Sequence, residues 1–230
     1  EYFDFRISMG DLYGSTAAKL REKNKGVIAI NAGFFEHDRL LDIRKPVGLR
    51  IIGSVKMSDH WRTIPRERNR KGGGALAMDS VGLRVVPDRE LDNLQARYAV
   101  QSSPVLIEHG GIWAGIAKNH IRSRRTAVCL EGDGKVVFLL VHEGELSLHE
   151  LARLFGDPER TAGSPLSREK PVLQGDGRLA CDAAIALDGG PSTQASAEGA
   201  PPIEIQGGWP IYDAIMAFPK GKTTSGNEDR

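Results

Sequence analysis

Two short apolar segments of the chain each end in a polar residue followed closely by glycine. The side chains of these polar residues could bind a ligand or take part in catalysis. The segments end at Asn31-Ala32-Gly33 and at Asp188-Gly189-Gly190. Glycine lets the backbone approach a ligand closely and leaves N–H groups open, which suits sugar hydroxyls or phosphate oxygens. A plain Asx turn explains either site alone, since Asn and Asp are common turn residues. The recurrence of the pattern indicates a binding or catalytic site.

A basic stretch at residues 116–125 could supply the cations of such a site. It contains Lys118, Arg122, Arg124 and Arg125 and no acidic residue. Guanidinium groups hold phosphate through paired, charge-assisted hydrogen bonds. A solvated basic loop would have the same composition, so both interpretations stay open.

A second basic stretch, residues 60–71, includes Trp61 and raises the question of nucleic-acid binding. The whole chain has 31 Lys and Arg against 30 Asp and Glu, a formal charge of +1. A near-neutral protein has no global field that attracts a polyanion. We therefore expect no nucleic-acid partner; steep salt dependence of duplex binding would indicate one.

Several other chemistries have no sequence support. The chain has neither the GxSxG pattern of many hydrolases nor the GxxxxGK[ST] loop of nucleotide-binding proteins. Its histidines show no HxxxH or HxH spacing, and its two cysteines no CxxC spacing, so no metal site is predicted. Calcium held near Asp188 is left open, although no ligand loop of recognisable spacing supports it. We expect no cofactor.

Cys129 and Cys181 each lie in an apolar stretch. Two buried free thiols are the favoured interpretation, because free cysteine is among the most buried residue types. A disulfide between neighbouring strands is the alternative and would indicate an oxidising compartment. The longest strictly apolar run, Val136–Val141, is too short to span a membrane.

The elements that must position these residues are mostly strands. Segments 126–130 and 136–142 flank a Glu-Gly-Asp-Gly turn and predict a hairpin. Ser147 and Glu150 form a capping box that predicts a helix ending at Gly156. A shorter helix is predicted at 15–24, closed by Gly26. Further strands are predicted at 2–7, 27–30, 48–52, 75–78, 83–86, 105–107, 183–187 and 212–218.

Strands outnumber helices and do not alternate strictly with them, which favours an α+β fold over a doubly wound α/β fold. We expect a single domain over residues 1–219, with a mixed, largely antiparallel β-sheet and a few flanking helices. Residues 157–180, rich in proline, glycine and charge, are predicted to be a flexible insertion. Residues 220–230 are predicted to be a disordered tail.

Five short motifs occur in an order that resembles the phosphodiester glycosidase family, over residues 27 to 218. They are Ile-Asn-Ala-Gly-Phe-Phe at 30–35, Pro-Val-Gly at 46–48, Gln-Ser-Ser-Pro-Val-Leu-Ile at 101–107, Arg-Arg-Thr-Ala-Val at 124–128 and Leu-Asp-Gly-Gly-Pro-Ser-Thr at 187–193. The resemblance implies hydrolysis of the bond between an anomeric carbon and a phosphodiester oxygen. It also implies a secreted or periplasmic, bacterial protein with a glycan or sugar-phosphate substrate.

The resemblance and the chemistry together give each matched residue an expected role. A departing phosphate monoester is a stable anion, so charge stabilisation matters more than a general acid. Asp188 is expected to act as base, nucleophile or hydroxyl-binding group, and Asn31 to orient the sugar or the water. The expected catalytic residues are Asp188, Asn31, Arg125 and the second carboxylate Glu36. The expected substrate-binding residues are Arg122, Thr126, Ser103, Gly189, Gly190, Ser192 and His37, with Arg122 and Arg125 on the phosphate and His37 as an alternative proton carrier.

The expected function is therefore hydrolysis of a sugar-1-phosphodiester in an extracellular or envelope glycan. The competing hypothesis is a non-catalytic carbohydrate-binding or envelope polysaccharide assembly protein on the same scaffold. The sugar, the anomeric outcome and the oligomeric state stay open. Either hypothesis requires Asn31 and Asp188 to meet in one site.

Overall fold

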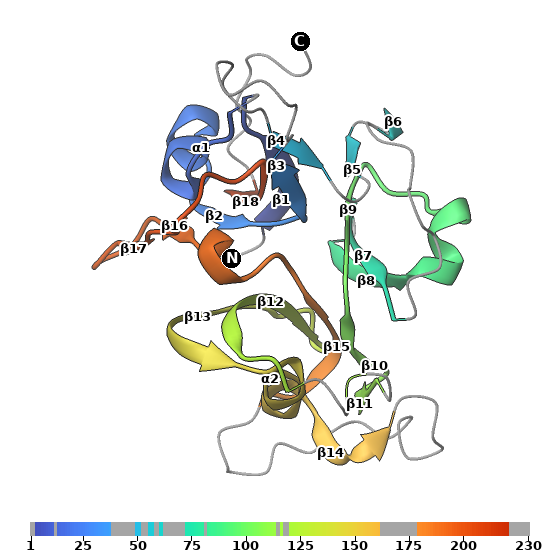
Figure 1. Ribbon diagram of the computed structural model, residues 1–230. Coiled ribbons are helices and arrows are strands. Elements are labelled where there is room, and N and C mark those ends of the chain that lie inside the picture. Colours follow the sequence, from blue (N-terminus) through green and yellow to red (C-terminus); the bar gives the residue numbers. More distant parts are fainter. Residues whose placement is uncertain are drawn as a thin grey trace.

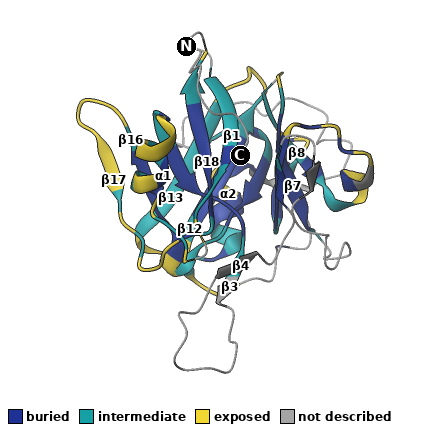
Figure 2. Ribbon diagram, turned by 90° about the horizontal axis from the view of Figure 1, so that it is seen from above, coloured by how far each residue is buried: buried dark blue, intermediate teal, exposed yellow. Residues whose placement is uncertain are grey.

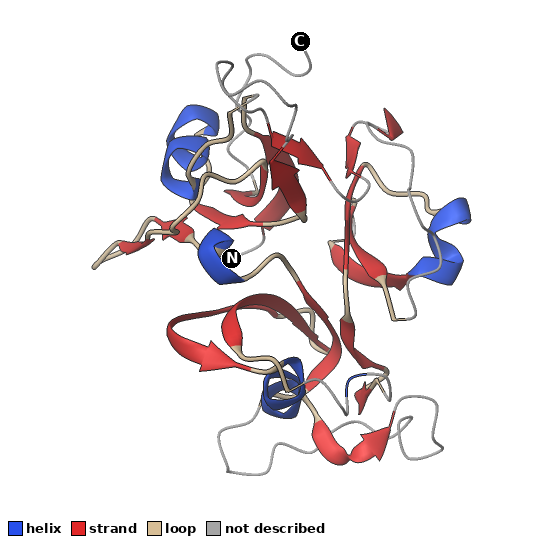
Figure 3. Cartoon of the chain, viewed as in Figure 1, coloured by secondary structure: helices blue, strands red, loops and turns tan. Residues whose placement is uncertain are grey.

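The fold is taken from a computed structural model, which describes most of the chain. The described residues are 3–11, 13–37, 49–51, 55–57, 60–61, 72–80, 82–113, 116, 120–161 and 179–220. Three larger β-sheets surround a shared interior, with short helices on the outside (Figures 1 and 3). The predicted α+β fold with largely antiparallel sheets is confirmed.

The first sheet has the strand order β1-β18-β2-β16-β17, and all its pairs are antiparallel. Helix α1 (Ala17–Asn24) packs Leu20 against the outer face of this sheet. Lys25, at φ 58°, ends α1 in the left-handed conformation, one residue before the predicted Gly26. The strands are β1 (Phe3–Met9), β2 (Ile28–Asn31), β16 (Ala195–Ala197), β17 (Ile203–Ile205) and β18 (Asp213–Pro219).

The second sheet has the order β13-β12-β15-β10-β11-β14, and the β11–β14 pair is parallel. Helix α2 (Leu148–Phe155) covers one face with Leu151, Ala152 and Phe155. Its capping box of Ser147 and Glu150 is formed as predicted. The strands are β10 (Val105–Glu108), β11 (Gly111–Ile112), β12 (Ser123–Glu131), β13 (Val136–Leu146), β14 (Asp157–Thr161) and β15 (Cys181–Ala186).

The third sheet has the order β6-β5-β9-β7-β8, and a two-stranded ribbon, β3–β4, stands apart from it. The 3₁₀ helix η1 (Asp88–Asn93) follows β8 and packs Leu91 against β7. The strands are β3 (Phe35–His37), β4 (Leu49–Ile51), β5 (Val55–Met57), β6 (His60–Trp61), β7 (Gly74–Met78), β8 (Leu83–Pro87) and β9 (Tyr98–Ser102).

The inner faces of the three sheets meet in one apolar core. Ile30 and Ile215 come from the first sheet, Val128 and Ile185 from the second, and Val100 from the third. Figure 2 shows these central strands as largely buried, while the turn between β16 and β17 reaches into solvent. Because side chains alternate along a strand, β12 turns Val128 toward this core and Ala127 and Cys129 toward α2.

The two cysteines form a disulfide, so the favoured interpretation of free thiols is wrong. Cys129 on β12 and Cys181 on the neighbouring β15 are bonded, with Cα atoms 5.5 Å apart. Both side chains are fully buried beneath α2. The strand pairing that brings them together depends on residues 52 positions apart, which the sequence alone does not pair.

Parts of the chain differ from the predicted pattern or lie outside the described residues. Strand β14 occupies the start of the predicted insertion at 157–180, because it pairs with β11. Residues 162–178, the tail 221–230 and Gly48 lie outside the described residues. Among the described helices, none is long and apolar enough to cross a membrane.

The disulfide should contribute to stability. Replacing both cysteines in a C129A/C181A variant should lower the free energy of unfolding by about 2–4 kcal/mol, because the unfolded chain regains the freedom of a long closed loop. Urea unfolding with and without dithiothreitol measures this. The reductant should destabilise the parent protein and leave the variant unchanged. A parent protein that is insensitive to reductant would contradict the bond.

Candidate functional site

Asn31 joins the two segments that the sequence singled out. Its Nδ2 donates a hydrogen bond to the backbone carbonyl of Asp188 at 2.6 Å, although the residues are 157 positions apart. Its Oδ1 accepts hydrogen bonds from Thr126 Oγ1 at 2.8 Å and from the backbone N–H of Gln194 at 3.1 Å. The side chain is 0% exposed. The predicted meeting of Asn31 and Asp188 is therefore confirmed.

The role of Asn31 in this arrangement is to hold the strand ends together. Its oxygen accepts two hydrogen bonds and one of its two amide hydrogens is used, so any direct contact with a ligand falls to the second hydrogen. The Thr126 hydroxyl is likewise fully buried and directed to Asn31. Direct substrate contacts by these two side chains stay predictions.

Gln194 extends the same network toward α1. Its Oε1 accepts a hydrogen bond from the backbone N–H of Ala17, in the first turn of the helix, at 2.8 Å. Its Nε2 donates to the carbonyl of Trp209 at 2.9 Å. Because both polar atoms of this buried side chain are paired, Gln194 holds the start of α1 and the Trp209 segment in place beside Asn31.

The turn after β15 depends on its glycines. The N–H of Asp188 donates to the carbonyl of Ala32 at 3.0 Å, which ties this turn to the one after β2. A Cβ at Gly189 would lie 2.7 Å from the carbonyl oxygen of Arg124, a clash that only glycine avoids. Gly190, at φ +59°, opens the 3₁₀ turn η4 (Gly190–Ser192). The close approach at Gly189 is to another backbone segment, and the predicted close approach to a ligand stays a prediction.

Asp188 is the half-buried carboxylate of this turn. Burial raises its pKa to about 6, and hydrogen bonds from the Ser192 side chain and the Gly189 N–H offset part of that rise. The Gly189 N–H lies 2.9 Å from Oδ1. A carboxylate whose pKa lies near the working pH suits general-base or nucleophilic chemistry.

Asp213, the first residue of β18, is the functional candidate that the sequence analysis missed. Its Oδ1 accepts the Gly33 N–H at 2.8 Å, and its backbone carbonyl accepts the Ala32 N–H at 3.3 Å. The residue is 1% exposed. Burial, and secondarily the charge of Asp188, raise its pKa to about 7. The sequence pattern that identified Asn31 and Asp188 could also have identified Asp213, because it too is a polar residue at the end of a buried apolar strand.

The arginines are engaged on the α2 side of the second sheet. Arg125 donates from Nε to the carbonyl of Leu146 at 2.8 Å and from Nη2 to that of Ile121 at 2.7 Å. Burial lowers its pKa from the ordinary value. Arg122 pairs with Glu150 at 2.8 Å and donates to the carbonyl of Glu145. The phosphate contacts expected of both arginines stay predictions.

The remaining predicted residues are only partly placed. Ser103 lies between β9 and β10, next to the end of β15, because the Pro104 carbonyl accepts the Ala186 N–H at 3.0 Å. Glu36 and His37 lie on β3, directly after the Asn31 turn, paired with β4. Their side chains lie outside the described residues.

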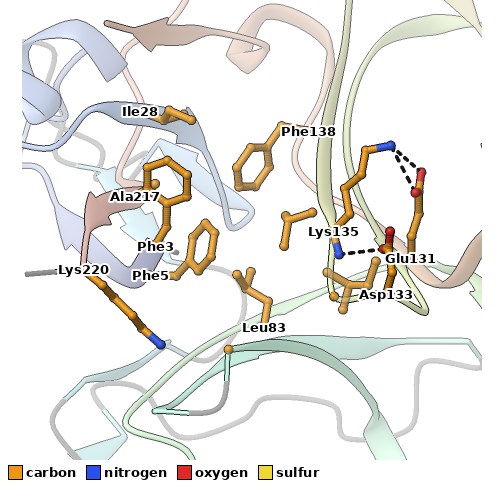
Figure 4. Close-up of a pocket in the computed structure, with 14 residues that line it drawn as sticks. Phe3, Phe5, Ile28, Leu83, Glu131, Asp133, Lys135, Phe138, Ala217 and Lys220 are labelled. Atoms are coloured by element: carbon orange, nitrogen blue, oxygen red, sulfur yellow. Dashed lines mark hydrogen bonds and ion pairs between the residues drawn. The ribbon is translucent and has the colours of Figure 1, made fainter. Parts of the chain in front are cut away.

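A cavity of about 630 Å³ lies at the other end of the strands. Its wall includes Ile28 at the start of β2, Ala217 near the end of β18, and the tip of the β12–β13 hairpin (Figure 4). Phe5 and Phe138 contribute rings whose centroids are 6.1 Å apart. Asn31 and Asp213 stand at the opposite ends of their strands, so this cavity is separate from the Asp188 site. Within the described residues, no three His, Cys, Asp or Glu side chains form a metal cluster.

The model of the phosphodiester glycosidase family matches residues 24–158, more than half of the chain. The match includes four of the five motifs and ends before the one that contains Asp188. No protein of curated function matches the chain in sequence.

Three solved structures share the fold over 94% of this chain. A hypothetical protein from Synechocystis has 14% identity and a TM-score of 0.56, and this chain spans 56% of its length. The zebrafish N-acetylglucosamine-1-phosphodiester α-N-acetylglucosaminidase catalytic domain, auto-inhibited by its pro-peptide, has 13% identity and a TM-score of 0.60, and this chain spans 73% of its length. A putative exported protein from Burkholderia pseudomallei has 10% identity and a TM-score of 0.52, and this chain spans 71% of its length. At these identities the likeness shows the fold alone.

The Asn31 network predicts a large stability effect. Asn31→Ala should lower the free energy of unfolding by about 2–4 kcal/mol, because it leaves the Thr126 hydroxyl and the Gln194 N–H buried without their acceptor. Thr126→Ser, which keeps the hydroxyl, is the matched control and should cost about 1 kcal/mol or less. Chemical denaturation measures both. Equal losses of stability in the two variants would contradict the prediction that the Asn31 hydrogen bonds stabilise the fold.

Proposed function

This chain belongs to the phosphodiester glycosidase family, and we propose that it hydrolyses the bond between the anomeric carbon of a sugar and a phosphodiester oxygen. The observation that carries the proposal is the position of Asp188. It is a half-buried carboxylate on a glycine turn with a pKa of about 6, held by Asn31 at the meeting point of two sheets.

The reaction needs one ionised carboxylate at the anomeric carbon. Asp188 either takes a proton from the water that attacks this carbon, or attacks the carbon itself to form a glycosyl ester, which water then cleaves at the same carbon to release the sugar and free Asp188. The bond from the anomeric carbon to oxygen breaks, and its electron pair stays on the phosphate, which leaves as a monoester anion. Because that anion is stable without a proton, the site can work without a strong general acid.

The arginine stretch 122–125 is the proposed phosphate side. Arg124 is exposed, and its backbone carbonyl lies against Gly189, next to Asp188. Arg125 has two of its guanidinium nitrogens on backbone carbonyls, which leaves Nη1 for a ligand. A planar, permanently charged guanidinium suits a phosphodiester oxygen pair.

The proposed place of action is outside the cytoplasm, on an extracellular or envelope glycan. The Cys129–Cys181 bond supports this, because structural disulfides persist mainly in oxidising compartments. One of the proteins that share the fold is described as a putative exported protein.

A panel of methyl esters of sugar 1-phosphates, followed by phosphorus NMR in ¹⁸O-labelled water, tests the reaction. The expected product is methyl phosphate without the heavy isotope, since water attacks carbon and not phosphorus. Asp188→Asn should lower kcat/KM by about 10²–10⁴-fold. Asp133→Asn, in the exposed turn of the β12–β13 hairpin, is the matched control and should be unaffected. Sugar binding without any product would favour the non-catalytic carbohydrate-binding alternative, and labelled phosphate would exclude the proposed bond cleavage.

The pKa of Asp188 fixes the acid side of the pH profile. Since the ionised form reacts, kcat/KM should fall about tenfold per pH unit below about pH 6, where the carboxylate gains its proton. Steady-state rates between pH 4 and 7 measure this. A rate that rises on acidification would instead assign Asp188 the role of general acid.

A further inference from the structure

Asp213 is a buried carboxyl group that the proposed reaction does not yet use. Its side chain is on the same face of β18 as Ile215, which belongs to the central core where the sheets meet. One oxygen, Oδ1, accepts the Gly33 N–H at 2.8 Å. The other, Oδ2, is buried and has no hydrogen-bond partner among the described residues. A full negative charge is costly in such surroundings.

Asp213 and Asp188 both form hydrogen bonds with the short turn at Ala32 and Gly33. Ala32 donates its N–H to the Asp213 carbonyl and accepts the Asp188 N–H at its own carbonyl. Gly33 completes the fit, because a Cβ there would lie 3.0 Å from Asp213 Oδ2 and 2.9 Å from Val100 Cγ2. The two carboxyl groups thus share one backbone support, with an apolar side chain from β9 beside it.

Among the residues that the structure describes, the elements around Asp213 bring no compensating cation. On β1 its neighbour is Met9, on β2 the next pair is Asn31 with Ala214, and β9 contributes Val100. Among the ionisable groups of the described residues, Asp188 is the one whose charge acts on Asp213. Two like charges on this shared, buried turn cannot both form readily without a cation, so one of the two groups keeps its proton.

We propose that Asp213 is a positioning residue for the proposed hydrolysis: its buried carboxyl group keeps a proton, so that the pair carries one negative charge and that charge is on Asp188. The inference rests on the proposed function and deepens it. In the neutral state Asp213 holds Gly33 and the turn beneath Asp188. When it ionises, a second negative charge lies beside the reacting carboxylate and the anionic substrate, and the reaction slows.

Asp213→Asn tests the proposal, because the amide is neutral at every pH, has nearly the same shape and can still accept the Gly33 N–H. At pH 6 the variant should keep kcat/KM within about threefold of the parent value. Above about pH 7 the parent should lose about tenfold per pH unit as Asp213 ionises, and the variant should not. An alkaline fall that is identical in both proteins would overturn the proposal, as would a large loss in the variant at every pH.

A second measurement does not depend on turnover. A raised pKa in the folded state means that the folded protein holds a proton that the unfolded chain has lost, so stability falls as pH rises from about 4 toward 7. Asp213→Asn removes this dependence. The difference in melting temperature, variant minus parent, should therefore grow by several degrees between pH 5 and pH 8. Asp133→Asn should show no such trend.

The two measurements separate the possible failures. If the melting difference grows but no sugar phosphodiester is cleaved, the proposed function fails while the protonated state of Asp213 stands. If cleavage occurs but the melting difference is constant, Asp213 does not titrate in this range and the inference fails alone. Asp188→Asn provides a check on the coupling between the two groups. Without the charge of Asp188, Asp213 should ionise at a lower pH, so the pH-dependent loss of melting temperature should end at a lower pH than in the parent protein.

Discussion

The hydrogen bond from the Asn31 amide to the Asp188 carbonyl is the contact on which the arrangement of the site depends. It closes a span of 157 positions and is partly buried, and the two hydrogen bonds that the Asn31 oxygen accepts, from Thr126 and Gln194, are buried. A buried polar group without a partner costs about as much as several ordinary contacts provide. The partners must therefore come together as a unit, and with them β2, β12 and the turn after β15.

This support explains why the carboxyl groups at the site are unusual. Asp188 lies half-buried on a glycine turn, and Asp213 is directed into the shared core from β18. Neither has a salt-bridge partner among the described residues, and burial is the main cause of the raised pKa in each. The fold thus shields both carboxyl groups from water without pairing either of them to a described cation, and a single negative charge has a larger effect there than in water.

The parts of the molecule that were predictable from sequence are those set by local chemistry. The hairpin around residues 131–134 and the Ser147 capping box depend on neighbours in the chain, and both formed where expected. Asn31 and Asp188 were found because each ends a buried strand. The pairing of Cys129 with Cys181, the direction of Arg125 and the burial of Asp213 depend on which strands lie side by side. Strand β9 was missed for a related reason: as a fully buried central strand it shows no alternation of apolar and polar residues.

A crystal structure of the Asp188→Asn variant, with whichever sugar 1-phosphate methyl ester the parent protein cleaves, is the most direct test of this arrangement. The anomeric carbon should lie within contact distance of residue 188, with the sugar against the turn at Gly189 and the phosphate toward Arg124. A ligand bound instead in the cavity lined by Phe5 and Phe138, with the Asp188 turn unchanged, would contradict it.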